Sequence, residues 1–226
     1  MGILGRMPEE TLLVRRAAFG ELVTAGKPVG FNLVAAATSL TPDTTRRALR
    51  LVESAGMAET NEDRVVGIDG LTTRATRHEI ELNGVSLWTW CAYDIVGIAA
   101  ALGADAAGET ACGWCNRPIE VAVRKGRPAG GTTVGWLPKE SCSNVMEQFC
   151  PSALFFCSVE HLERWRAETD RPSGEALDLT ELAQRGVAGW RELVSKRHRG
   201  LRAAAPWLGS RRTRPGPGRR GRRART

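Results

Sequence analysis

The sequence predicts an α+β protein in which a winged helix-turn-helix-like helical module packs on a larger mixed α+β domain. Apolar residues recur at helical spacing through residues 8–56, which indicates a group of helices. From about residue 77, short strands are mixed with helices in no regular βαβ order. We therefore expect the helical module at 1–75, the α+β domain at 76–208 and a disordered basic tail at 209–226.

Helix signals place the elements of the N-terminal module. Thr41 is a natural N-cap, Pro42 suits the first helical position, and Gly26 and Gly56 are plausible helix ends. The predicted elements are helices over 8–26, Phe31–Ala37 and Pro42–Gly56, followed by a hairpin through Arg64–Ile68.

This module has two interpretations. The third helix carries Arg46, Arg47 and Arg50, which could meet DNA in the major groove. Three helices can equally serve only to pack against the following domain, since fold does not fix function. We favour the structural role because acidic residues lie close by, namely Glu53, Glu59, Glu62 and Asp63.

In the α+β domain, the order of elements follows from alternation and apolar runs. A strand is expected near 78–82, and a mostly buried helix from Leu87 to about Leu102. The later elements are strands over Pro118–Val123 and Thr132–Leu137 joined by a Gly-rich loop, a strand over Ala153–Val159, and helices over Glu160–Ala167 and Leu179–Lys196.

Charge and composition narrow the class of protein. The net charge of +7 comes from residues 195–226, which hold 12 Lys or Arg and no acidic residue. Residues 1–194 hold 20 basic and 25 acidic residues, so this part of the chain is net acidic. Nucleic acid is therefore not an expected partner. No apolar run reaches about 18 residues and no signal peptide is evident, which predicts a cytoplasmic protein away from membranes.

Six cysteines carry the chemical information in this chain. Without a signal peptide they indicate thiol chemistry or metal binding, not a disulfide framework. Cys91 and Asp94 stand three residues apart on the predicted helix, on one face. An apolar setting raises the pKa of a carboxylate toward that of a thiol, so Asp94 could take a proton from Cys91.

The other cysteines leave several possibilities open. If Cys150 converges with Cys91 and Asp94, two thiolates and a carboxylate would clamp a soft metal ion. Cys112 and Cys115 form a C-x-x-C pair that could belong to a structural zinc site. No second pair at the spacing of a zinc knuckle is found among the later cysteines, so Cys142 and Cys157 are interpreted as incidental thiols.

Taken together, these motifs resemble the organomercurial (alkylmercury) lyase family. The resemblance rests on Gly70-Leu-Thr-Thr-Arg, Glu79-Ile-Glu-Leu-Asn and Leu87-Trp-Thr-Trp-Cys-Ala-Tyr-Asp94. It continues through Cys112 and Pro118 to Phe149-Cys150, Phe155-Phe156, Ser158-Val159 and Trp165, and covers most of residues 1–195. The chain differs from the family pattern at Pro151, where some members have another cysteine, and at the additional Cys115.

The resemblance implies that Cys91 and Cys150 bind mercury and that Asp94 donates the proton. It implies a structural role for Cys112, while the extra Cys115 leaves a metal-binding or redox role open for both. No organic cofactor is expected. The implied partners are an organomercurial substrate and, as acceptors of mercury(II), cellular thiols or a mercuric reductase; a monomer is our default expectation.

Two alternatives remain at this stage. A metal-responsive winged-helix transcriptional regulator would use the thiols as a metal sensor and would need a basic DNA-binding surface. A zinc-stabilised partner-binding protein would contain stoichiometric zinc and unfold on chelation. The acidic folded region and the unneeded Asp94 count against the regulator, and we favour the lyase.

Overall fold

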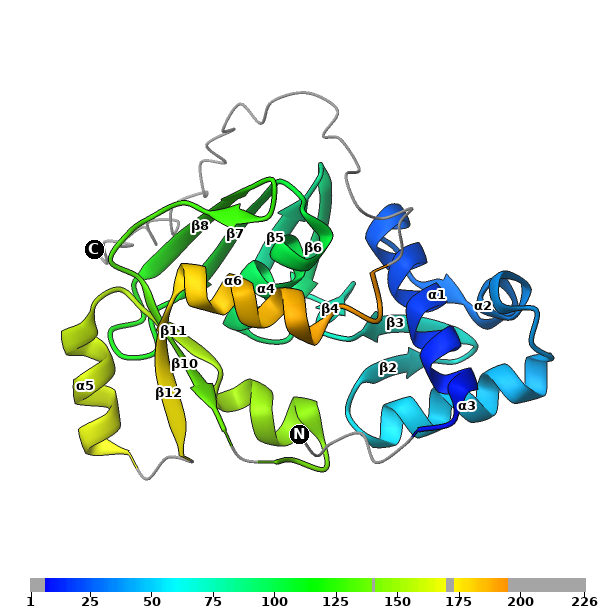
Figure 1. Cartoon of the computed structure of the whole chain (residues 1–226). Helices are drawn as coiled ribbons and strands as arrows, with labels where there is room; N and C mark the ends of the chain where they lie inside the picture. Colours follow the sequence, from blue (N-terminus) through cyan, green and yellow to red (C-terminus); the bar gives the residue numbers. More distant parts are fainter. Residues whose placement is uncertain (1–6, 140, 170–172, 195–226) are drawn as a thin grey trace, which may run out of the picture.

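The computed structural model describes residues 7–139, 141–169 and 173–194 (Figure 1). Its N-terminal part contains three helices, α1 (Glu9–Ala25), α2 (Phe31–Thr38) and α3 (Pro42–Ser54). Gly26 ends α1 in the left-handed conformation, and the Thr41 hydroxyl accepts a hydrogen bond from the Thr44 N–H at 3.2 Å. The three predicted helices are confirmed because these local capping signals determine their ends.

A large antiparallel sheet runs through both halves of the chain. Its strands are β1 (Val29–Gly30), β2 (Ala58–Asn61), β3 (Arg64–Ile68), β4 (Leu71–Thr72), β5 (Glu79–Leu82), β6 (Val85–Thr89), β7 (Ala106–Ala111), β8 (Pro118–Arg124) and β9 (Arg127–Pro128). The strand order is β1-β3-β4-β6-β5-β7-β8-β9, with β2 beside β3. β4 pairs with β6, Leu71 opposite Thr89, so the sheet is continuous across residue 75.

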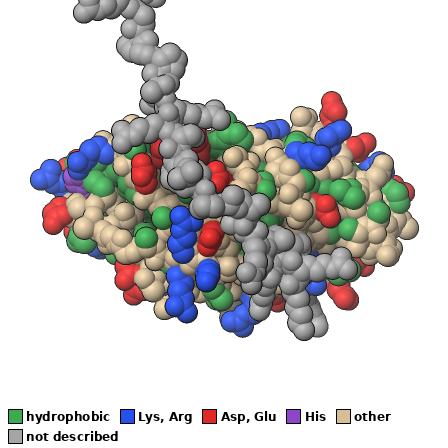
Figure 2. Space-filling view, turned by 90° about the horizontal axis from the view of Figure 1, so that it is seen from above, with side chains coloured by type: hydrophobic (Ala, Val, Ile, Leu, Met, Phe, Trp, Pro, Cys, Tyr) green, Lys and Arg blue, Asp and Glu red, His purple; other side chains and the backbone are tan. Residues whose placement is uncertain are grey.

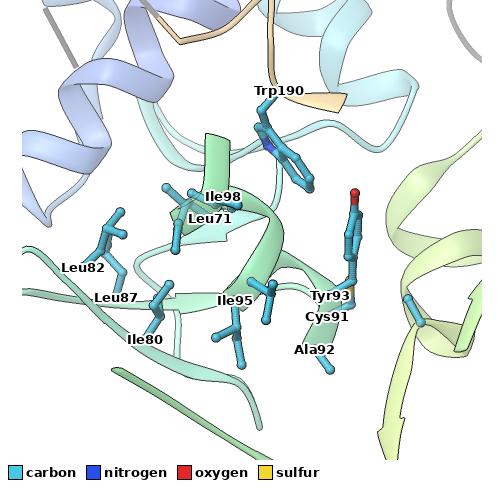
Figure 3. Close-up of a cluster of buried hydrophobic side chains, with 14 of the residues drawn as sticks. Leu71, Ile80, Leu82, Leu87, Cys91, Ala92, Tyr93, Ile95, Ile98 and Trp190 are labelled. Atoms are coloured by element: carbon cyan, nitrogen blue, oxygen red, sulfur yellow. The ribbon is translucent and has the colours of Figure 1, made fainter. Parts of the chain in front are cut away.

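Helix α4 (Ala92–Leu102) covers one face of this sheet, and the main core lies between them (Figure 3). Ile95 and Ile98 on α4 are fully buried. The helix approaches β7 so closely that a Cβ at Gly108 would meet Ile95 Cγ2 at 2.4 Å. Helix α6 (Leu179–Gly189) crosses α4 where Gly186 lies against Gly97, which lets the two backbones touch.

A second, three-stranded sheet lies at the far end of the molecule from α1–α3 (Figure 1). Its central strand β10 (Val134–Pro138) pairs antiparallel with β11 (Leu154–Phe156) and β12 (Gly174–Asp178). Helix α5 (Val159–Glu168) packs on it through Trp165, whose ring lies 5.7 Å from Trp136 and 5.1 Å from Phe156. The mixture of helices with antiparallel sheets confirms the α+β class.

Some predicted elements were wrong. The helix expected from Leu87 begins only at Ala92, because Val85–Thr89 is strand β6. Asn83 and Gly84 both have positive φ, as a tight hairpin turn requires, and this turn pairs β6 with β5. The two strands expected to flank a Gly-rich loop lie in different sheets, and β7 and β12 were not predicted.

None of the helices in the described ranges is long and apolar enough to cross a membrane. The expected last helix ends at Gly189. Its predicted end at Lys196 and the basic tail at 209–226 lie outside the described residues.

Candidate active site

Two of the predicted thiols and the predicted carboxylate converge in the interior. The sulfur atoms of Cys91 and Cys150 and a carboxylate oxygen of Asp94 all lie within 4.8 Å of one another. The three residues are 0%, 8% and 4% exposed, respectively. Cys91 immediately precedes α4, whereas Cys150 begins a short 3-10 turn, η2 (Cys150–Ser152), that leads into β11. The convergence that the sequence left open is therefore present.

Cys91 is the N-cap of α4 and does not lie within the helix as expected. Its backbone N–H donates a hydrogen bond to Asp94 Oδ2 at 2.9 Å, in the manner of a capping box. This local geometry brings the thiol and the carboxylate together as effectively as the expected helical spacing. The helix N-terminus also favours negative charge at this point.

The Asp69–Gly70 turn between β3 and β4 packs directly against the Asp94 side chain. Both residues have positive φ, and a Cβ at Gly70 would lie 2.8 Å from Asp94 Cγ. Arg15 on α1 holds the turn through an ion pair with Asp69, at 2.5 Å between Nη2 and Oδ1. Trp190, after α6, donates from Nε1 to the Asp69 carbonyl at 2.8 Å. The position of Asp94 thus depends on contacts from both ends of the chain.

The segment that carries Cys150 rests on the end of α3. It begins with a π-helical turn, η1 (Val145–Phe149), whose first N–H donates to the Ala55 carbonyl at 3.1 Å. Gly56 leaves room for Asn144, since a Cβ there would lie 2.0 Å from Asn144 Oδ1. The N-terminal helices therefore contact the supports of both Asp94 and Cys150.

A second group of cysteines lies on the surface side of the same domain. The ligand atoms of Cys112, Cys115, Cys157 and His161 are all within 4.8 Å of one another. Cys112 is buried and the other three are half-buried. The Arg117 guanidinium donates to Cys115 Sγ at 3.4 Å and to Cys157 Sγ at 3.6 Å.

Comparison with known proteins identifies the family. The family model described as "Alkylmercury lyase" matches residues 71–189, more than half of the chain, and this range includes Cys91, Asp94 and Cys150. The chain belongs to the alkylmercury lyase family. The alkylmercury lyase of Pseudomonas putida is 31% identical over 166 residues, which is 71% of this chain and 76% of that protein. The alkylmercury lyase of Streptomyces lividans is 29% identical over 174 residues, or 74% and 77% of the two chains.

A solved structure extends the likeness to the whole fold. The crystal structure of the mercury-bound form of MerB2 superposes with a TM-score of 0.77 at 25% sequence identity. The match covers 85% of this chain and 95% of that chain. The N-terminal helices lie outside the residues matched by the family model.

The electrostatics of the alkylmercury lyase cluster follow from its burial. Burial raises the pKa of Asp94 to about 7, although N–H groups of the backbone at Cys91 and Trp90 and the Cys91 thiol oppose this rise. Burial, together with Cys150 and Asp94, raises the pKa of Cys91 well above its ordinary value. Near pH 7 Asp94 is therefore about half ionised, and its ionised form lies beside a protonated Cys91 thiol with one proton ready for transfer.

Analysis of the sequence missed several residues in and around these clusters. Cys157 is not incidental, because it lies 3.8 Å from Cys115 Sγ and 3.1 Å from His161 Nδ1. The signal in the sequence is the spacing Cys157-x-x-x-His161, which pairs a cysteine with a histidine and not with a second cysteine. The pKa of Cys142 is raised, first by burial and second by the charge of the nearby Cys150. The support of Asp94 by Arg15 is a long-range contact without a local signal.

Proposed function

We propose that this chain cleaves the carbon–mercury bond of organomercurials by protonolysis, with Cys91, Asp94 and Cys150 as the catalytic residues. The observation that carries the proposal is the buried convergence of two thiols with one carboxylate of raised pKa. Two soft sulfur ligands suit mercury, and a neighbouring acid suits protonation of the leaving carbon.

The reaction begins with displacement of the weakest ligand of mercury. Cys150, which is 8% exposed against 0% for Cys91, meets the substrate first and loses its proton with the displaced ligand. Cys91 then attacks mercury while Asp94 accepts the Cys91 proton. The second thiolate pushes electron density onto carbon, which makes the carbon basic enough to be protonated.

The second step breaks the carbon–mercury bond. Asp94 delivers the proton from Cys91 to the carbon, the bonding pair remains with that carbon, and a hydrocarbon leaves. Mercury(II) stays on the two thiolates, and Asp94 is again ionised. Exclusion of water matters here because it keeps the proton between the sulfur, the carboxylate and the carbon.

Release of so soft an ion requires competing thiols. We propose small cellular thiols or a mercuric reductase as acceptors, which fits a protein that acts in the reducing cytoplasm. The six free cysteines are consistent with such a compartment. The chemistry requires no organic cofactor.

The N-terminal module is proposed to be winged-helix-like in form and supportive in function. Its interpretation as a unit over 1–75 rests on α1–α3 with the β2–β3 hairpin. Arg46 on α3 already pairs with Asp43 and Asp63, each at 3.5 Å, which weakens the case for a DNA-binding regulator. The face seen from above in Figure 2, on the opposite side of the molecule from α3, carries both acidic and basic side chains. Support of Asp94 and Cys150 is the role that its contacts favour.

The test is hydrocarbon release from phenylmercury in the presence of excess thiol. We expect benzene from the parent and only the thiol background from Asp94→Asn, Cys91→Ala and Cys150→Ala. Glu109→Gln, which changes an exposed carboxylate on β7, is the matched control and should retain activity. Circular dichroism would verify that each variant folds. A folded, reduced parent that releases no benzene would refute the proposal.

A further inference from the structure

The four-residue cluster is built from two short loops. Cys112-x-x-Cys115 follows β7, and Cys157-x-x-x-His161 joins β11 to the first turn of α5. We call each of these ligand-bearing loops a knuckle. Structural zinc sites typically take two ligands from each of two knuckles. We infer that Cys112, Cys115, Cys157 and His161 bind a structural zinc ion.

Two of three measured separations between the ligand atoms are close to those of tetrahedral coordination. With zinc–sulfur bonds of about 2.3 Å and zinc–nitrogen bonds of about 2.0 Å, neighbouring sulfurs lie about 3.8 Å apart and sulfur–nitrogen pairs about 3.5 Å apart. Cys115 Sγ lies 3.8 Å from Cys157 Sγ, and Cys112 Sγ lies 3.7 Å from His161 Nδ1. The distance of 3.1 Å between Cys157 Sγ and His161 Nδ1 is shorter than the sulfur–nitrogen distance expected around zinc. A small movement of one side chain would complete the tetrahedron.

The backbone holds both knuckles independently of any ion. In the first, the Cys112 N–H donates to the Arg117 carbonyl at 2.8 Å, and the Asn116 N–H returns to the Cys112 carbonyl at 3.0 Å. The second knuckle is joined to it because the Gly113 N–H donates to the Phe155 carbonyl at 2.8 Å. Such preorganisation keeps the donors together before a metal binds.

Charge also favours a divalent cation at this site. Three thiolates and a neutral imidazole around Zn²⁺ leave one negative charge, and the Arg117 guanidinium beside two of the sulfurs balances it. Mercury(II) prefers two sulfurs in a line, whereas four donors at tetrahedral spacing fit zinc. The closed set of four ligands leaves no position for a substrate, which assigns the ion a structural role.

The inferred zinc would connect the two sheets. Its first knuckle belongs to the β7–β8 turn of the large sheet, and its second follows β11 of the small sheet. β11 also follows Cys150, so the ion would anchor the strand that leads away from a catalytic thiol. This inference is independent of the proposed reaction.

The experiment measures zinc in full-length protein purified with reductant and without added metal. Mass spectrometry of the metal content should give about one zinc per chain in the parent. Cys115→Ala and Cys157→Ala should fall below about one tenth of that value. Cys91→Ala and Cys142→Ala, which remove thiols outside the cluster, should retain the zinc.

A second measurement covers variants that fail to fold. The metal-free, reduced parent is titrated with Co²⁺, and we expect thiolate-to-cobalt charge transfer and tetrahedral d–d bands that Zn²⁺ abolishes. Zinc should also protect Cys115 and Cys157, but not Cys142, from iodoacetamide. A parent that binds neither ion, that binds Hg²⁺ but not Zn²⁺ at these residues, or that carries a Cys115–Cys157 disulfide would overturn the inference. No organomercurial is used, so the result does not depend on lyase activity.

Discussion

Two sulfur clusters in one chain differ in what surrounds their thiols. Cys91 shares a buried site with Asp94, and burial and negative neighbours hold its proton on the sulfur. Cys115 lies half-buried beside Arg117, whose hydrogen bonds lower the pKa of that thiol to about 6. A thiol that keeps its proton can supply it to a reaction, whereas a thiol that gives it up is ready to bind a cation permanently. The residues around each thiol, more than the cysteines themselves, therefore distinguish the proposed catalytic site from the inferred structural metal site.

The sharpest test of this contrast removes one thiol from each cluster. Cys91→Ala should lower benzene release at least about a thousandfold, because it removes the proton carrier and a mercury ligand. Cys115→Ala should instead lower the free energy of unfolding, by about 4 kcal/mol when free zinc is a thousandfold above its Kd. Activity assays and chemical denaturation measure the two effects. If both variants lost activity equally and neither lost stability, the two clusters would not have separate roles.

A second test compares two Asx-Gly turns. Gly70→Ala should reduce kcat about 10- to 100-fold, because the new Cβ would displace Asp94 from 2.8 Å. Gly84→Ala is the matched control, since Gly84 also has positive φ, at 85° against 97°, but has open space around its Cβ position. Both variants carry backbone strain, and only the first should impair catalysis beyond its loss of stability. Equal losses of kcat would show that strain alone matters.

His78 contacts the two strands that lead into the clusters, β6 through Thr89 and β7 through Thr110, and makes the stability of the fold depend on pH. Its carbonyl accepts from the Thr89 N–H at 2.9 Å, and its Nδ1 lies 2.7 Å from Thr110 Oγ1. Burial, and then the charge of Arg77, lowers the pKa of His78 to about 4. The neutral ring is therefore favoured in the folded state, so stability is complete above pH 6.5 and is lost as pH falls toward 4.

The measurement is denaturation of the parent and of His78→Gln across this range of pH. We expect the parent to lose about 2 kcal/mol more than the variant between pH 6.5 and 4. If the free energy of unfolding changed equally with pH in the parent and in His78→Gln, His78 would not be the group that causes the loss of stability.

The smallest expected effect concerns the pH dependence of catalysis. Asp94 must be ionised to accept the Cys91 proton, and its pKa is about 7. The single-turnover rate without added thiol should therefore rise with pH and level off above pH 7. At pH 6 it should be roughly tenfold below the plateau, because about one tenth of Asp94 is ionised. A flat profile from pH 5.5 to 8 would contradict this role for Asp94.

Local signals predicted the helical module well and the α+β domain less well. Thr41 with Pro42, and Gly26, are capping signals that act within one turn, so they can be recognised directly. The run Leu87–Trp90 is apolar enough for a helix or a strand, and only the Asn83–Gly84 turn and its partner strand decide. Strands such as β12 depend on distant partners and gave no local signal.

The proposed catalytic residues could be predicted from the sequence for a similar reason. Cys91 and Asp94 are close along the chain, and the family motif supplied Cys150. Their meeting in space depends on packing against Ala55 and on the turn at Gly70, which no local pattern expresses. His161 was missed because its ligand partners come from another loop, although its spacing from Cys157 was visible.

The continuity of the large sheet has a consequence for any shortened version of the protein. β4 pairs with β6, and the Trp90 N–H donates to the Gly70 carbonyl at 2.9 Å. A fragment that starts at residue 76 would leave this side of β6 as an open edge, ending two residues before Cys91. Unpaired edges recruit strands from other molecules, so the fragment should self-associate. By pairing with β6, strand β4 should therefore keep this edge from pairing with other molecules.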